Sequence, residues 1–235
     1  MITEGLNAWV LHVRKSGETS AEITFFTREK GVVRARYKGG CTPKKQALLQ
    51  VFTPLWLTLD IRHDWHYVRQ LEAVSASISL KDDALFAGLY VNELIYQGLS
   101  PLEPSPDFYD AYVHTLQALT LANDRTTIAI FLRRLEWRWL TLCGYQMSLT
   151  HDAESKLPID AGKVYAFIAG DGFVLSNQGF QGAHIIAWAN DLLEDTGVLK
   201  AVKSIMRRAI DHALDGKPLQ TRKLYIKNTT VSSHD

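Results

Sequence analysis

Five short strand-like runs, separated by turn signals, fill the chain up to residue 74. The runs are rich in β-branched and aromatic side chains and cover residues 9–13, 22–27, 31–38, 55–59 and 67–74. Glycine, serine, aspartate and basic residues at the junctions between them are typical of tight turns. Several short strands in so small a region suit a closed sheet. The sequence therefore predicts an OB-fold β-barrel over residues 1–80.

The third run alternates between apolar and basic side chains from Val33 onward. Because successive strand residues point to opposite faces, one face of this strand is apolar and the other is basic. The basic face and the loop after it contain the candidate DNA-binding residues Arg34, Arg36, Lys38, Lys44 and Lys45. Phosphate contacts need charge and reach rather than a tight shape match, so a basic face and a glycine-containing loop suit a phosphate backbone. The alternative is an edge strand protected by its charges.

Beyond residue 80 the apolar residues recur at helical spacing. A first helix begins at Asp82 and Asp83 and is ended by prolines, a second follows Pro106, and a third covers about 126–143 before Gly144. The fold class is therefore α+β, with a five-stranded OB-fold barrel followed by a mostly α-helical domain over residues 81–228. Residues 229–235 are expected to form a disordered tail.

The helical domain carries a small insertion near residues 160–178, where Gly170-Asp171-Gly172 predicts the turn of a hairpin. Two helices follow, at about 183–194 and 198–214, and the second has an apolar stripe and a basic outer face. That face and the segment after it supply a second set of candidate DNA-binding residues: Lys200, Lys203, Arg207, Lys217 and Arg222. A surface helix needs a polar face in any case, so solvated surface is the alternative here.

The net charge is only +1, but the charges are unevenly distributed. Residues 28–45 and 200–227 are strongly basic, whereas residues 82–110 contain six acids and no lysine or arginine. Two basic patches on a nearly neutral protein indicate contact with a polyanion at defined faces.

Several protein classes are excluded by what the sequence lacks. The two cysteines, Cys41 and Cys143, provide neither a disulfide framework nor a four-cysteine zinc site, and they fit the reducing cytosol. The first residues lack the pattern of a signal peptide, and the absence of any apolar stretch of 18 residues predicts no membrane span. Neither a phosphate-binding P-loop nor a serine-nucleophile elbow is present, so no ATP-driven motor or serine hydrolase is indicated. We expect a cytoplasmic protein without a cofactor.

The segment His63-Asp64-Trp65-His66 places two histidines three residues apart with a carboxylate between them. Such a set could begin a metal site. It lies in an expected turn between strands, however, and no second ligand pair lies nearby in sequence. A polar turn without metal is therefore the favoured interpretation.

Arginines interrupt the otherwise apolar third helix at Arg133, Arg134 and Arg138, next to Trp137 and Trp139. A guanidinium beside apolar surface can bind an acidic peptide that ends in an apolar residue. The alternative is that these arginines pair with acids inside the fold. The residues alone favour that second interpretation.

The chain resembles the RecO family of bacterial DNA repair proteins, which are recombination mediators. The resemblance extends over nearly the whole chain and depends on the order and spacing of its motifs. The motifs are Ala8-Trp9-Val10-Leu11-His12, Gly17-Glu18-Thr19-Ser20, Phe26-Thr27, Gly31-Val32-Val33-Arg34, Lys38-Gly39-Gly40, 49–55 (LQVFTPL), 88–94 (GLYVNEL), Leu132-Arg133-Arg134-Leu135-Glu136, Cys143-Gly144-Tyr145 and 216–222 (GKPLQTR).

The resemblance implies a protein without nuclease or ATPase activity that binds single- and double-stranded DNA and anneals complementary strands. It also implies docking on the C-terminal tail of single-stranded-DNA-binding protein, cooperation with RecR in loading RecA, and a location at the nucleoid. Arg133, in the matching arginine pair, becomes the candidate residue for the tail.

Many members of the family carry a four-cysteine zinc finger in the region that matches residues 150–180. This sequence has no cysteine there, so it resembles a zinc-free branch of the family, with the predicted hairpin in place of the finger. Two other function classes stay open. One is a metal-dependent enzyme acting on nucleic acid through His63, Asp64 and His66, and the other is a protein-interaction adaptor without DNA contact.

Overall fold

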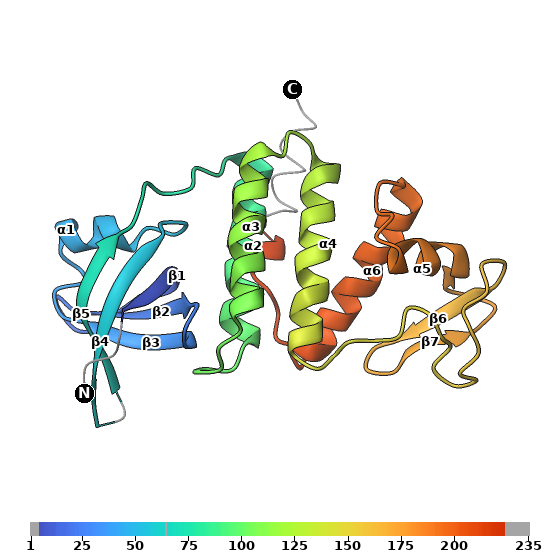
Figure 1. Cartoon of the computed structure of the whole chain (residues 1–235), viewed down its shortest axis with the longest axis horizontal. Helices are drawn as coiled ribbons and strands as arrows, with labels where there is room; N and C mark the ends of the chain where they lie inside the picture. Colours follow the sequence, from blue (N-terminus) through green and yellow to red (C-terminus); the bar gives the residue numbers. More distant parts are fainter. Residues whose placement is uncertain (1–4, 64, 224–235) are drawn as a thin grey trace. The chain divides into compact units, whose positions relative to one another are not determined.

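The computed structural model describes residues 5–63 and 65–223 (Figure 1). The predicted disordered tail at 229–235 and Asp64 lie outside the described residues. The five expected strands are all present, and the bounds that differ from the predicted ranges do so by one to three residues. They are β1 (Leu6–Lys15), β2 (Ala21–Thr27), β3 (Gly31–Tyr37), β4 (Leu55–Arg62) and β5 (Trp65–Ala73).

The five strands close into a barrel in the order β1-β2-β3-β5-β4, with β4 pairing back onto β1. Neighbouring strands are antiparallel except β3 and β5, which run parallel. A short helix α1 (Pro43–Gln46) and the 3-10 turn η1 (Ala47–Leu49) join β3 to β4. Side chains that include Val10, Ile23, Phe25, Leu57 and Leu59 fill the interior and are entirely buried. The predicted five-stranded OB-fold barrel is confirmed.

Two helices, α2 (Asp82–Gly98) and α3 (Pro106–Leu121), pack on the outer side of β1 and β2. Phe26 points out of the barrel and meets the rings of Phe108, Tyr109 and Tyr112 at centroid distances of 6.1, 5.3 and 5.5 Å. This contact explains why β2 carries apolar residues on both of its faces, since both faces are covered.

A buried polar link accompanies this aromatic contact. The hydroxyl of Tyr112 donates to Asn92 Oδ1 at 2.8 Å, and Asn92 Nδ2 donates to the Val10 carbonyl at 3.4 Å. The two hydrogen bonds tie α3 to α2 and α2 to β1. Buried polar groups are tolerated when they satisfy one another in this way.

By its internal contacts the chain divides into two compact units. The first is Met1–Leu121 together with the segment that begins at Leu219, and the second is Ala122–Pro218. The returning segment is held in the first unit by Glu93, whose carboxylate accepts hydrogen bonds from the backbone N–H groups of Gln220 and Thr221 at 2.7 and 2.8 Å. The boundary predicted at residue 80 separates strands from helices along the sequence.

The second unit consists of three helices and a small sheet. The helices are α4 (Arg125–Leu142), α5 (Gly182–Ala189) and α6 (Thr196–Ala213), and the strands are β6 (Val164–Ile168), β7 (Gly172–Leu175) and β8 (Phe180–Gln181). The side chains of Asp124 and Asp195 cap the first turns of α4 and α6. Strands β6 and β7 form the expected hairpin, in which Gly170 and Gly172 adopt φ angles of +96° and +120° that favour glycine.

A loop before this hairpin is organised by the carboxylate of Asp152, which is 3% exposed. Its Oδ1 accepts from the backbone N–H groups of Glu154 and Ser155 at 2.9 and 2.7 Å, and its Oδ2 accepts from that of Leu175 at 2.7 Å. These bonds hold the pKa of Asp152 below its usual value, the bond from Ser155 having the largest effect. One side chain thus closes the loop onto β7 in the region where many members of the resembled family carry zinc.

None of the helices within residues 5–63 and 65–223 combines the length and the apolar character that crossing a membrane requires.

Candidate nucleic-acid interface

The basic residues of β3 lie on the outer face of the barrel. Val33 and Ala35 are buried in the core, whereas Arg34 is exposed and Arg36 is half-buried. Lys38, directly after the strand, is also exposed. The predicted alternation is confirmed, and the contact of these residues with DNA stays a prediction.

The loop that follows β3 folds back on itself. Thr42 Oγ1 donates to the Gly39 carbonyl at 2.7 Å, and Lys45 Nζ donates to the Lys38 carbonyl at 2.8 Å. Lys45 therefore has a hydrogen-bond partner within the loop, whereas Lys44, on the short helix α1, is exposed. The five predicted residues lie along one strand and the loop that continues it.

The outer face of β5 adds aromatic residues that the sequence interpretation did not select. Trp65 is 42% exposed, and the guanidinium Cζ of Arg36 lies 3.9 Å from the centroid of its ring. Arg62 Cζ lies 5.9 Å from the ring centroid of Tyr67. The alternation of aromatic residues at 65 and 67 was the available signal, but Trp65 was assigned to a turn.

Acidic side chains on this face neutralise some of its arginines but not those of β3. Asp60 lies 3.1 Å from Arg62 and 3.7 Å from Arg69. Among the residues that the structure describes, no carboxylate lies within ion-pair distance of Arg34 or Arg36. The arginines without an acidic partner therefore lie on β3. There a phosphate would not have to displace a carboxylate from the guanidinium groups.

A groove of about 730 Å³ lies between the loop after β3 and the outer side of β5. Lys38 and Lys45 line it from the loop, and Arg69 and Glu72 line it from the strand. The groove therefore places the predicted residues Lys38 and Lys45 near Arg69, which was not among the predicted DNA-binding residues.

The second predicted basic set does not form one site within either unit. Lys200, Lys203 and Arg207 lie on the exposed side of α6, whose predicted apolar stripe is buried through most of its length. Lys217 is exposed near the end of the second unit. Arg222 belongs to the first unit, where its guanidinium lies 5.9 Å from the ring centroid of Tyr90.

Arg133 is only 7% exposed and forms a buried ion pair with Glu136 on α4. Its neighbour Arg134 is exposed and pairs with Asp191, with its Nε at 3.0 Å from Oδ1. The geometry at Arg133 is the internal pairing that the residues alone favoured. Binding of a partner tail at this residue stays a prediction.

The histidines of the metal hypothesis do not share a described site. His63 lies in the turn after β4, and His66 is half-buried on β5, where burial, and then the charge of Lys30, lower its pKa. Asp64 lies outside the described residues. Across 5–63 and 65–223, no group of three or more histidine, cysteine or carboxylate side chains is arranged to hold a metal ion.

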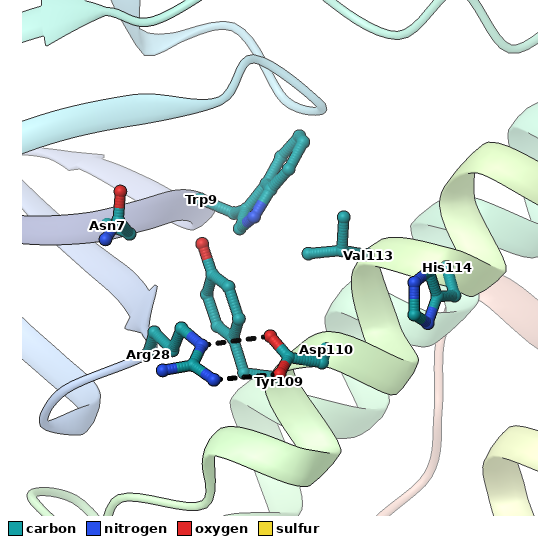
Figure 2. A pocket seen from close by; sticks show the side chains of 7 residues that line it. All are labelled: Asn7, Trp9, Arg28, Tyr109, Asp110, Val113 and His114. Carbon is teal, nitrogen blue, oxygen red and sulfur yellow. Dashed lines mark hydrogen bonds and ion pairs between the residues drawn. The ribbon is translucent and has the colours of Figure 1, made fainter.

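A pocket of about 360 Å³ lies between β1 and α3, and Figure 2 shows the side chains that line it. Arg28 is one of the lining residues and donates two hydrogen bonds to Asp110, at 3.0 and 2.9 Å. The bond from Arg28 lowers the pKa of Asp110, and burial raises the pKa of Tyr109 to about 12. Because the charged side chains satisfy each other, the pocket offers little to an ionic ligand.

Comparison with known proteins covers both parts of the chain. The family model described as recombination protein O N terminal matches residues 1–77, and the model described as recombination protein O C terminal matches residues 83–220. The DNA repair protein RecO of Legionella pneumophila (strain Corby) is 46% identical over 226 residues, which cover 96% of this chain and 99% of that protein. The proteins of the same name from Pseudomonas putida (strain W619) and Shigella flexneri are 36% and 35% identical, and each match covers at least 95% of this chain and 97% of the relative.

Proposed function

The chain belongs to the RecO family of DNA repair proteins, and from that premise we propose that it acts as a non-enzymatic mediator of homologous recombination. In this role it binds single- and double-stranded DNA and anneals complementary strands. It also helps to load RecA onto DNA coated by single-stranded-DNA-binding protein, whose C-terminal tail it binds, and it works with RecR. Family membership supports a role in DNA repair, and the finer steps are the proposal.

The observation that carries the DNA-binding step is the pair of arginines on β3 without acidic partners in the described chain. A cation that is already paired must break its ion pair before it can contact phosphate, whereas Arg34 and Arg36 have no such cost. Lys38 and Lys44, both exposed, extend the same charge along the loop. A row of this kind can follow a backbone without reading its sequence.

Annealing follows from contacts of this type. Two complementary strands repel each other through their phosphates, and cations on the protein reduce that repulsion while leaving the base edges free to pair. No covalent bond is made or broken, so the step requires neither a nucleotide cofactor nor a catalytic group. The residues of α6, Lys200, Lys203 and Arg207, provide a second basic surface for another segment of DNA.

The test is annealing of two complementary oligodeoxynucleotides by the full chain without ATP, in the presence of single-stranded-DNA-binding protein. We expect wild type to accelerate annealing, and the double variant Arg34→Ala/Arg36→Ala to do so poorly. The double variant Lys156→Ala/Lys163→Ala is the matched control, because it removes the same charge from two exposed lysines outside the predicted sites. A wild-type protein that neither binds nor anneals DNA would point to an adaptor, and metal-dependent cleavage of the strands would point to an enzyme.

A further inference from the structure

The outer face of β3, β5 and β4 carries two aromatic rings between arginines from both neighbouring strands. The parallel register pairs Ala35 with His66 and Arg36 with Tyr67, so Arg34 lies beside Trp65. On the other side, Arg62 is directly opposite Trp65, and Asp60 is opposite Tyr67. Because residues in register share a face, these side chains form one continuous surface, which we call the aromatic platform: Arg34, Arg36, Arg62, Trp65 and Tyr67.

Each ring of the platform has an arginine over it, and the contact at Trp65 is the closer of the two. With Arg36 Cζ 3.9 Å from the ring centroid, the Trp65 indole and a planar guanidinium lie against each other. Even so, 42% of the Trp65 surface is exposed. A large aromatic side chain that stays exposed on a strand of a folded domain is surface available to a partner with a flat apolar face.

The surrounding charge identifies that partner. A partner with an acidic backbone and flat apolar groups fits a surface in which cations alternate with rings, and unpaired nucleotides have both properties. In a duplex the base faces are already stacked on one another, so they are not available to the ring of Trp65.

The position on the barrel agrees with this assignment. In the OB-fold, the face of the second and third strands and loops that include the one between the fourth and fifth strands bind oligonucleotides. Trp65 is the first residue of β5, directly after that loop.

We propose that the aromatic platform binds unpaired bases of a single strand by stacking on Trp65 and Tyr67, while Arg34 and Arg36 contact the flanking phosphates. This assignment rests on the proposed function and adds to it a means by which the barrel distinguishes single-stranded from double-stranded DNA. The stacking contribution is separate from the ionic one, because it needs a base and is insensitive to salt.

The test compares the affinity of full-length variants for a labelled single strand, for the corresponding duplex, and for a strand in which abasic sites replace the bases at the centre. Trp65→Leu and Tyr67→Leu remove the rings, and Trp65→Phe and Tyr67→Phe keep one. Tyr145→Leu is the control, because Tyr145 is an aromatic residue of similar exposure, at 40%, in the second unit.

We expect each leucine variant to bind the single strand about 5- to 100-fold more weakly, with the salt dependence unchanged and duplex affinity within about twofold of wild type. The phenylalanine variants should retain most of the affinity. Wild type should bind the abasic strand more weakly than the normal strand, and Trp65→Leu/Tyr67→Leu should no longer distinguish the two. Equal affinity of wild type and Trp65→Leu for the single strand, or an equal loss for single strand and duplex, would overturn the assignment.

Intrinsic fluorescence provides a second readout that does not depend on a destabilising variant. Trp65 is the one exposed tryptophan among the six, all of which the structure describes. Trp9, Trp139 and Trp188 are at most 5% exposed, and Trp56 and Trp137 are half-buried, so Trp65 is the tryptophan that a base reaches most readily. We expect single strands to quench wild-type emission and to quench Trp65→Phe much less. Full quenching in Trp65→Phe would contradict stacking at this residue.

The same measurements separate this inference from the function on which it rests. If Arg34→Ala/Arg36→Ala binds DNA weakly while Trp65→Leu binds it normally, the barrel binds phosphates and the stacking assignment is wrong. If neither variant changes the affinity for any strand, the barrel is not the DNA-binding surface, and both the stacking assignment and the role of β3 are wrong. If wild type itself binds no strand, the proposed function fails.

Discussion

The guanidinium of Arg133 donates a hydrogen bond to the carboxylate of Glu136, one turn further along α4, and both side chains are buried. A buried charge of this kind is held in place by its partner, and its removal affects the fold as well as any ligand that reaches it. The relationship makes Arg133 a residue at which stability and binding have to be measured together.

Arg133→Ala is expected to lower the melting temperature. Loss of a hydrogen bond to a charged group costs about 1.5–3 kcal/mol, which corresponds to roughly 3–12 °C for a chain of this size. Arg134→Ala removes the same charge from an exposed pair and should shift the melting temperature little. Thermal unfolding of the two variants side by side gives the comparison, and equal shifts would contradict a structural role specific to Arg133.

The predicted contact of Arg133 with the tail of single-stranded-DNA-binding protein is tested on the same variant. If the tail carboxylate reaches the guanidinium, Arg133→Ala should bind a tail peptide roughly ten- to a hundredfold more weakly. The measurement is made at a temperature at which the variant is folded. An unchanged affinity would remove Arg133 from the tail site.

Arg34→Ala and Arg36→Ala are each expected to reduce the salt dependence of DNA binding. Removing one phosphate-binding cation lowers the slope of log affinity against log salt by about 0.7–0.9. The slope of the double variant should therefore be smaller by roughly 1.4–1.8. Titrations at several salt concentrations measure it. An unchanged slope would mean that the basic face only protects the strand.

Asp152→Asn is expected to destabilise the second unit, because a neutral amide accepts the backbone hydrogen bonds of Ser155 and Leu175 less well than the carboxylate does. The pKa of Asp152 is lowered in the folded state, so its contribution is present above the ordinary carboxyl pKa and is lost as the pH falls through the lower folded value. Thermal unfolding from neutral to acidic pH should show a weaker loss with acid in the variant. Asp171→Asn, at an exposed carboxylate in the hairpin turn, is the control.

Purified protein is expected to contain no stoichiometric zinc, because the region matching the family's zinc finger has no cysteine. Treatment with a chelator should leave the melting temperature unchanged. One zinc per chain by elemental analysis would contradict this prediction and direct attention to His63 and His66.

The barrel was predictable from the sequence because its signal is local. The alternation from Val33 onward determines which side chains of β3 face outward, and the turn residues mark where each strand ends. The pairing of β3 with β5 joins residues 35 and 66, and no local pattern encodes it. The neighbours of Arg34 and Arg36 on the aromatic platform were therefore not predictable from the periodicity.

The apolar residues that recur at helical spacing along α4 are not all buried. Ile128, Leu135 and Trp139 are buried, whereas Leu142 is 42% exposed. The buried face also includes Arg133 and Glu136, whose opposite charges pair with each other. Helical periodicity assigns every charged residue to the exposed face, so it cannot identify a buried ion pair.

The barrel closes between β3 and β5 through a short parallel ladder, which joins Ala35 with His66 and Arg36 with Tyr67 among the described residues. The backbone hydrogen bonds of a short ladder break by local opening, and the free energy of that opening is lower than for a longer ladder. Arg34 and Arg36 lie on one side of this seam and the aromatic rings on the other. A nucleic-acid strand that contacts both sides stabilises the pairing of β3 with β5. It binds the closed barrel and not the opened one, so its binding free energy adds to the free energy of opening. Hydrogen exchange at the seam would then slow with each bound strand, so the ligand itself sets how rigid the barrel is.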